Sequence, residues 1–403
     1  MRKALYRFEF MQFIQNKKNV LFLLLFVLTI VFYVIYTVPT KEETYENHQL
    51  SLQVYVDSWT EFYKALVKQE KEQNNRYSEF NIKFYENMVL NLTALQNKDI
   101  PNYIESSANH YRIFMEGTQN GDVLIPENYL KNFKYSFQQV IHDYNKSRIE
   151  FEALSAANNI NFSEIYALTS FQQMRLWIQQ LFPYFLLLIP ILYANDIFTK
   201  DIKHKTIMDS VPVSLYQQVN MKSFIVFIFA FGSTIFIILS SLVVMAIRNG
   251  WGSLYLPVTR FIGDEYDVIS TAMFFVQSFC LLILAAFFLI RLCMVFSLLF
   301  RNEFITLFLG VALLFSERVY QNTFFIEMVD VSILPNTYFD MGNVITGDKA
   351  VFYQNNYITF LDGVIVLATS IIVAEVALYI FSTFRLNRFL PKKLLEKSGK
   401  VEA

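Results

Sequence analysis

The sequence predicts an all-α polytopic membrane protein with six transmembrane helices, both termini in the cytoplasm and a helical extracellular domain. Hydrophobic residues make up 54% of the 403 residues and charged residues only 17%, whereas soluble proteins carry about 25% charged residues. The charges cluster between long apolar runs, and roughly twenty apolar helical residues cross a bilayer. Proposed cytoplasmic segments hold sixteen Lys and Arg, against four in the short outside loops, which fits the positive-inside bias.

The first segment, residues 1–18, is predicted to form an interfacial helix on the cytoplasmic face. Its apolar residues recur at helical spacing, and its Lys and Arg residues suit the head-group region. A basic tail that only sets topology is the alternative. The first span, 19–39, contains no charge. It lacks the small-residue cleavage site of a signal peptide, so we expect it to be retained.

Residues 40–176 form a long hydrophilic section that must lie outside, because it follows a cytoplasmic terminus and one span. Apolar residues recur in it every three or four positions, as in Phe84, Met88, Leu92 and Leu95. This spacing predicts a helical extracellular domain. We interpret its aromatic stripes as the core of that domain, and contact with a substrate is the alternative.

The second span, 177–194, contains Pro183 and Pro190, which permit a kink when neighbouring groups satisfy the freed carbonyl. A polar cytoplasmic coupling loop follows it. The remaining predicted segments are the coupling loop at 195–222, span three at 223–247, an outside loop at 248–268, span four at 269–300, a cytoplasmic turn with span five at 301–315, an outside, re-entrant segment at 316–357, span six at 358–384 and a basic cytoplasmic tail at 385–403.

Charged residues within spans are candidates for function, because burying them in a bilayer is costly. Glu375 in span six and Arg291 near the inner end of span four are the clearest cases. An ion pair or a polar translocation path would explain either residue. Snorkelling to the interface is the alternative for Arg291, and structural pairing is the alternative for Glu375.

No enzyme chemistry emerges from the sequence. The four His residues are scattered, and H-E-x-x-H, G-x-S-x-G and paired-cysteine motifs do not occur. The run Gly342–Lys349 resembles a P-loop faintly, but its Lys stands one place late and no Ser or Thr follows. We therefore expect no catalysis, no metal and no cofactor bound by this chain. Nucleic acid is not an expected partner, since the basic residues lie at span ends.

The coupling loop carries the most informative pattern. It contains an acid, a Thr, a Pro-Val-Ser run and a Lys that opens span three. This order resembles the loop between spans two and three of type-2 ABC transporter permeases, except that Lys205 stands where that family usually has glycine. The L-P-N-T-Y-F run starting at Leu334 is similar to the family's segment before its last span. The resemblance covers the spanning region but not residues 40–176.

The resemblance implies an exporter half that moves an amphipathic or lipophilic substrate, such as a peptide, an antimicrobial or a lipid. It implies a cytoplasmic ABC ATPase dimer that supplies ATP and Mg²⁺ chemistry, a second permease copy or paralogue, and a location in the lipid of a plasma membrane. Lys- and Asn-rich usage suggests a bacterium. The residues expected at the ATPase-docking surface are Asp201, Lys203, Lys205, Thr206, Pro212, Ser214 and Lys222.

Three alternatives stay open. The coupling loop could be a solvated connector whose lysines only set topology. The chain could be a membrane sensor or immunity protein whose extracellular domain binds a peptide without transport. An ion-driven transporter is the third, and it is disfavoured because few polar residues lie in mid-membrane and no internal repeat is evident.

Overall fold

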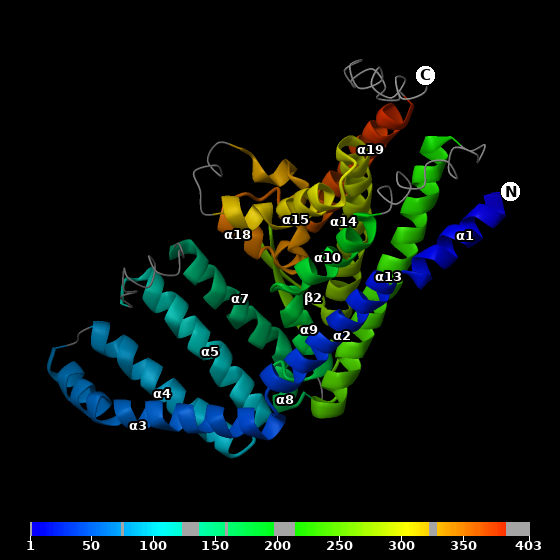
Figure 1. Cartoon of the computed structure of the whole chain (residues 1–403). Coiled ribbons are helices and arrows are strands. Elements are labelled where there is room, and N and C mark those ends of the chain that lie inside the picture. Colours follow the sequence, from blue (N-terminus) through cyan, green and yellow to red (C-terminus); the bar gives the residue numbers. More distant parts are fainter. Residues whose placement is uncertain are drawn as a thin grey trace, which may run out of the picture.

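The chain is a helical membrane protein (Figure 1). The computed structural model describes residues 2–73, 76–122, 137–157, 160–196, 214–321 and 329–383. Within these ranges, four helices are long and apolar enough to cross a membrane. They are α2 (Lys17–Thr37), α13 (Leu215–Asn249), α14 (Thr271–Phe300) and α19 (Phe360–Thr383).

These long helices leave large apolar side chains uncovered on their outer sides. Leu28 on α2 is 67% exposed, Val276 on α14 is 64% exposed and Val373 on α19 is 68% exposed. Soluble proteins rarely expose such residues in contiguous patches. A lipid environment removes the cost of this exposure, so the pattern agrees with membrane embedding.

The second predicted span is a broken helix. Helix α9 (Ser170–Ile178) stops at Ile178 and α10 (Phe182–Ala194) starts four residues later. The short α8 (Phe162–Ile165) together with α9 meets α10 at an angle of 68°, and the bent pair would be a fifth span if it counts as one. The bend lies at 179–181, before Pro183, rather than inside the helix at Pro190. Proline suits the first turn of a helix, where its missing N–H costs nothing.

Helix α10 forms the centre of the bundle. It packs against α13, α14 and α15 (Glu303–Tyr320), and its Leu187 and Ile191 are fully buried. A Cβ on Gly310 of α15 would lie 2.9 Å from Ile191 Cγ2. Small residues allow membrane helices to approach this closely, so Gly310 sets the distance between α10 and α15.

The region expected to hold span five and the outside segment differs in its boundaries. Helix α15 extends to Tyr320, five residues beyond the predicted end of the span at 315, and it carries Glu303, Glu317 and Arg318. Because of these three charges, α15 is not among the four helices that are long and apolar enough to cross a membrane. The described part of 316–357 continues in four short elements: η1 (Val331–Ile333), η2 (Pro335–Phe339), α17 (Met341–Ile345) and α18 (Asp348–Tyr353).

The long helices contact each other or α1 at both ends of the bundle. At one end, α1 (Arg2–Gln15) contacts α2 and the early part of α13. At the other end, Arg248 of α13 donates to the carbonyl oxygen of Ile35 on α2 at 2.5 Å. Helix α13 starts at Leu215, so eight residues assigned to the coupling loop belong to this helix instead. In Figure 1, α19 ends on the same side as α1.

A four-helix arm projects to one side of the bundle (Figure 1). It consists of α3 (Lys41–Gln73), α4 (Arg76–Gln96), α5 (Ile100–Gln119) and α7 (Phe137–Ser155), packed as successive neighbours. Phe84, Met88 and Leu92 are buried between these helices. The arm therefore has its own apolar core, to which Phe84 of the predicted aromatic stripes contributes.

A small β-hairpin departs from the expected all-α fold. Strands β1 (Pro257–Ile262) and β2 (Glu265–Ser270) pair antiparallel, and β2 continues two residues beyond the predicted outside loop, into predicted span four. Their connection, Gly263 and Asp264, has φ of +57° and +74°. A two-residue turn with positive φ at both positions matches the twist of a hairpin. β1 contacts α7 of the arm, so the hairpin joins the arm to the bundle.

Candidate functional site

The predicted docking surface is described only at its ends, because 197–213 lies outside the described residues. Ser214 is the N-cap of α13, and its Oγ accepts a hydrogen bond from the Gln217 backbone N–H at 3.3 Å. Capping accounts for a Ser at this position. The docking residues that lie outside the described residues are Asp201, Lys203, Lys205, Thr206 and Pro212.

Two ion pairs tie the ends of this segment to the N-terminal helices. At the α10 end, Lys18 Nζ lies 3.0 Å from Asp196 Oδ2 and donates to Asn195 Oδ1 at 2.8 Å. At the α13 end, Lys222 Nζ lies 3.1 Å from Glu9 Oε1, with side-chain exposures of 3% and 8%. Lys222, the residue predicted to open span three, is therefore buried against α1.

The two charged candidates within spans lie together. Arg291 Nε on α14 lies 3.3 Å from Glu375 Oε2 on α19. Two groups of α13 complete the arrangement: the Tyr216 hydroxyl donates to Glu375 Oε1 at 2.5 Å, and Arg291 Nη1 donates to Asn220 Oδ1 at 2.6 Å. Pairing and hydrogen bonding reduce the cost of placing charges in a bilayer. The ion pair and these two hydrogen bonds therefore join α13, α14 and α19.

A second group of charges, which the sequence did not single out, contains three buried residues and the partly exposed Arg318. We call Glu317, Arg318, Asp340 and Lys349 the buried charge cluster. Glu317 is 0%, Asp340 2% and Lys349 4% exposed. Glu317 and Arg318 lie on α15, Asp340 precedes α17, and Lys349 lies on α18. Two acids and two bases give the cluster no net charge.

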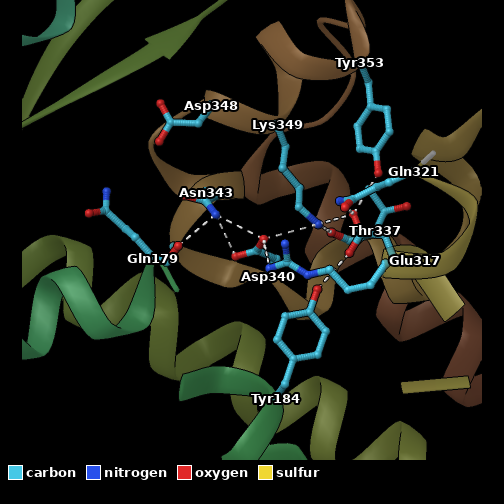
Figure 2. Close-up of polar contacts among 12 residues, drawn as sticks. Gln179, Tyr184, Glu317, Gln321, Thr337, Asp340, Asn343, Asp348, Lys349 and Tyr353 are labelled. Atoms are coloured by element: carbon cyan, nitrogen blue, oxygen red, sulfur yellow. Dashed lines mark hydrogen bonds and ion pairs between the residues drawn. The ribbon is translucent and has the colours of Figure 1, made fainter. Parts of the chain in front are cut away.

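Glu317 is the centre of the buried charge cluster. Its carboxylate accepts hydrogen bonds from Tyr184 at 2.9 Å, from Tyr353 at 3.0 Å and from Lys349 Nζ. Figure 2 shows the two tyrosines approaching from opposite sides, while Asp348 points away. Since Tyr184 belongs to α10 and Tyr353 to α18, this one carboxylate connects the centre of the bundle with the segment before α19.

Asp340 is held by the remaining members. Its Oδ2 lies 3.3 Å from Arg318 Nη2 and 3.8 Å from Lys349 Nζ, and Asn343 Nδ2 donates to both of its oxygens at 3.0 Å. Burial raises the pKa of Asp340, although Lys349 and Arg318 oppose that shift. The same Asn343 amide donates to the Gln179 carbonyl oxygen at 2.9 Å, which anchors the bend between α9 and α10.

A cavity of about 380 Å³ lies beside the buried charge cluster, between the arm and the bundle. Its walls come from α7, α15, α17 and α18 and carry charges of both signs. The charged and titratable residues that line it are His142, Asp143, Arg318, Asp340, Asp348 and Lys349. Ligand sites favour such junctions between structural units.

Asp348 clamps the arm to the bundle at this cavity. Lys146 Nζ on α7 lies 2.6 Å from its carboxylate and His142 Nε2 lies 3.0 Å from it, while His142 Nδ1 and the Tyr266 hydroxyl of β2 are 3.0 Å apart. Burial would raise the pKa of Asp348, but Lys146 and these hydrogen bonds hold it well below its usual range. These contacts connect α7 of the arm with α18, which also carries Lys349.

A signal for Glu317 was present in the sequence. The buried residues of α15 are Thr306, Gly310, Leu314 and Glu317, which recur every three or four positions on one helical face. Glu317 continues this face, but the predicted span ended at 315 because Glu317 and Arg318 carry charges. Asp340 and Lys349 had no comparable signal, because their burial depends on tertiary contacts.

Within the described residues, no group of three or more His, Cys, Asp or Glu is placed to hold a metal ion. The charged groups of the cluster are paired, so the arrangement suits a structural or conformational role better than acid–base catalysis. Comparisons with protein-family models, curated proteins and solved structures gave no match.

Proposed function

We propose that this chain is the membrane-spanning subunit of an ATP-binding cassette exporter of the type-2 class. In this proposal six spans cross the plasma membrane of a bacterium, with α15 and the bent α9–α10 pair added to the four long apolar helices. Both termini and the coupling loop face the cytoplasm, and the arm faces outside. A separate ATPase dimer binds ATP and Mg²⁺, and a second permease copy or paralogue completes the pathway for an amphipathic or lipophilic substrate.

The observation that carries the proposal is the attachment of both ends of the coupling loop to the N-terminal helices. The pairs Lys18–Asp196 and Glu9–Lys222 join the loop ends to α1 and α2. Glu9–Lys222 is buried on both sides, and removing one partner of such a pair costs about 3–5 kcal/mol, whereas Lys18 is partly exposed. A protein that pushes on the loop would therefore move α1, α10 and α13 together, as a lever for ATP-driven transport requires.

The test is purification of the tagged full-length chain together with its bound proteins. Wild-type protein is expected to retain a soluble ATPase, and the Lys203→Glu/Lys205→Glu and Pro212→Ala variants are expected to lose it. Reversal of two exposed lysines on the arm, Lys64→Glu/Lys68→Glu, is the matched control and should retain it. A folded wild-type protein that never retains an ATPase would refute the proposal.

The lever has its own test in the same complex. Lys222→Glu places two acids together beneath α1 and is expected to abolish substrate-stimulated ATP hydrolysis while the ATPase stays bound. The swapped pair, Glu9→Lys/Lys222→Glu, restores opposite charges and should restore much of the stimulation. If Lys222→Glu leaves stimulation intact, the ion pair does not transmit movement.

A sensor that signals without transport is the second candidate. The clamp of Lys146 and His142 on Asp348 favours it, because a ligand bound to the arm would act on the bundle through these contacts. The two functions predict different results with an ATPase. A transporter shows ATP hydrolysis that its substrate stimulates, whereas a sensor binds its ligand with no ATPase attached.

A further inference from the structure

The arm contains a cleft between α5 and α7 that the transport proposal does not explain. Its volume is about 640 Å³, within the range of roughly 300–1,000 Å³ that is usual for ligand sites. Its floor is apolar and includes Ile104, Leu154 and Ile160, which are 3%, 7% and 9% exposed. Its polar residues are Glu105, Asn109, Arg112, Glu152 and Ser155. The cleft is therefore amphipathic.

One carboxylate of the cleft, that of Glu105, is not paired with a base among the described residues, whereas two arginines share the other. Arg112 Nη2 lies 3.1 Å from Glu152 Oε1, and Arg148 Nη1 lies 3.1 Å from the same oxygen. Glu105 is exposed on α5 and makes no hydrogen bond or ion pair with the described residues. Residues 40–176 contain 18 Asp and Glu against 13 Lys and Arg, so the wider field also attracts cations.

The dimensions of the cleft fit a short extended chain. Its α5 wall runs from Ile100 to Arg112, which at 1.5 Å per helical residue is about 18 Å. A strand advances about 3.3 Å per residue, so roughly five residues span this length. Asn109 and Ser155 offer hydrogen-bonding groups for a peptide backbone.

We propose that the α5–α7 cleft binds a short extended peptide segment of apolar residues with one Lys or Arg. The apolar side chains lie on the floor of Ile104, Leu154 and Ile160, and the cationic group pairs with Glu105. This inference deepens the proposed function by naming a substrate class. It rests on that function only for what happens to the peptide after binding.

The test measures binding of fluorescent pentapeptide amides to the full-length protein in lipid nanodiscs without any ATPase. One peptide has four leucines and a central lysine, and its twin has glutamate in place of lysine. Wild-type protein is expected to prefer the lysine peptide by about five- to tenfold, the scale of an exposed ion pair replaced by repulsion. Signal from empty nanodiscs is subtracted, which removes binding to lipid.

Two variants and one control locate the site. Glu105→Lys is expected to reverse the preference toward the glutamate peptide, and Ser155→Trp, at an exposed position of the cleft, is expected to weaken both peptides. Glu116→Lys makes the same charge change at an exposed position on α5 away from the cleft and should keep the wild-type preference. Failure of wild type to bind either peptide, or equal effects of Glu105→Lys and Glu116→Lys, would overturn the proposal. Because no ATPase takes part, these results are independent of the purification test above.

Discussion

Replacing Lys349 by Met is expected to destabilise the whole bundle, because it removes the cation that both buried acids share. Lys349 Nζ contacts Glu317 and lies 3.8 Å from Asp340. Glu317 is 0% and Asp340 is 2% exposed. Met keeps the length and apolar stem of the side chain but carries no charge. The variant leaves the cluster with two acids and one base.

The magnitude follows from this burial. Breaking a buried ion pair by removing one partner costs about 3–5 kcal/mol in free energy of unfolding. Burial already raises the pKa of Asp340, and loss of Lys349 should raise it further. The variant can then relieve the excess charge by binding a proton. Its deficit in stability relative to wild type is therefore expected to be smaller at pH 5 than at pH 8.

The assay is equilibrium unfolding in mixed micelles, followed by tryptophan fluorescence. The double variant Glu317→Gln/Lys349→Met removes one charge of each sign and should recover at least half of the lost stability. Lys64→Met is the control, because the Lys64–Glu61 pair is exposed at 63% and 84% and should contribute little. The reasoning is refuted if Lys349→Met costs no more than Lys64→Met, or if the double variant costs the sum of its single changes.

Two further predictions concern packing and pH. A Cβ on Gly342 would lie 2.6 Å from the Ile178 carbonyl oxygen and 2.7 Å from Gln179 Cα, so Gly342→Ala should cost about 1–3 kcal/mol. Gly232→Ala on α13 meets nothing within 4 Å and should gain about 0.5–1 kcal/mol; equal shifts in unfolding would contradict the close approach at Gly342. Burial lowers the pKa of His110 in the arm to about 4 from 6.5, so the folded arm binds fewer protons than the unfolded arm between these values. The free energy of unfolding of the arm should fall by at most about 3 kcal/mol as the pH drops from 6.5 to 4. His110→Leu should lack this pH-dependent loss in a series of unfolding curves. If wild type and His110→Leu lose stability equally with pH, His110 is not buried in its neutral form.

The sequence alone determined which segments are apolar and which helical face they bury. Periodicity is a local property, so runs such as 19–39 and 269–300 predict membrane helices without knowledge of their neighbours. The same reasoning predicted helices with apolar stripes at 40–176, and Phe84 and Met88 of those stripes lie in the core of the arm. It also identified Arg291 and Glu375 as unusual, because a charge within an apolar run is visible in one dimension.

The tertiary structure decided which charges meet. Glu317 bonds Tyr184 from 133 positions away and pairs with Lys349 from 32 positions away, and no local pattern encodes such distances. Lys222 illustrates the same limit: the sequence places it at the start of an apolar run, but its pairing with Glu9 on α1 depends on the fold. Hydrophobic burial follows from sequence periodicity, whereas pairing of buried charges depends on which helices the fold brings together. The apolar helices can therefore be predicted from the sequence alone, whereas the buried charge cluster forms only in the folded molecule.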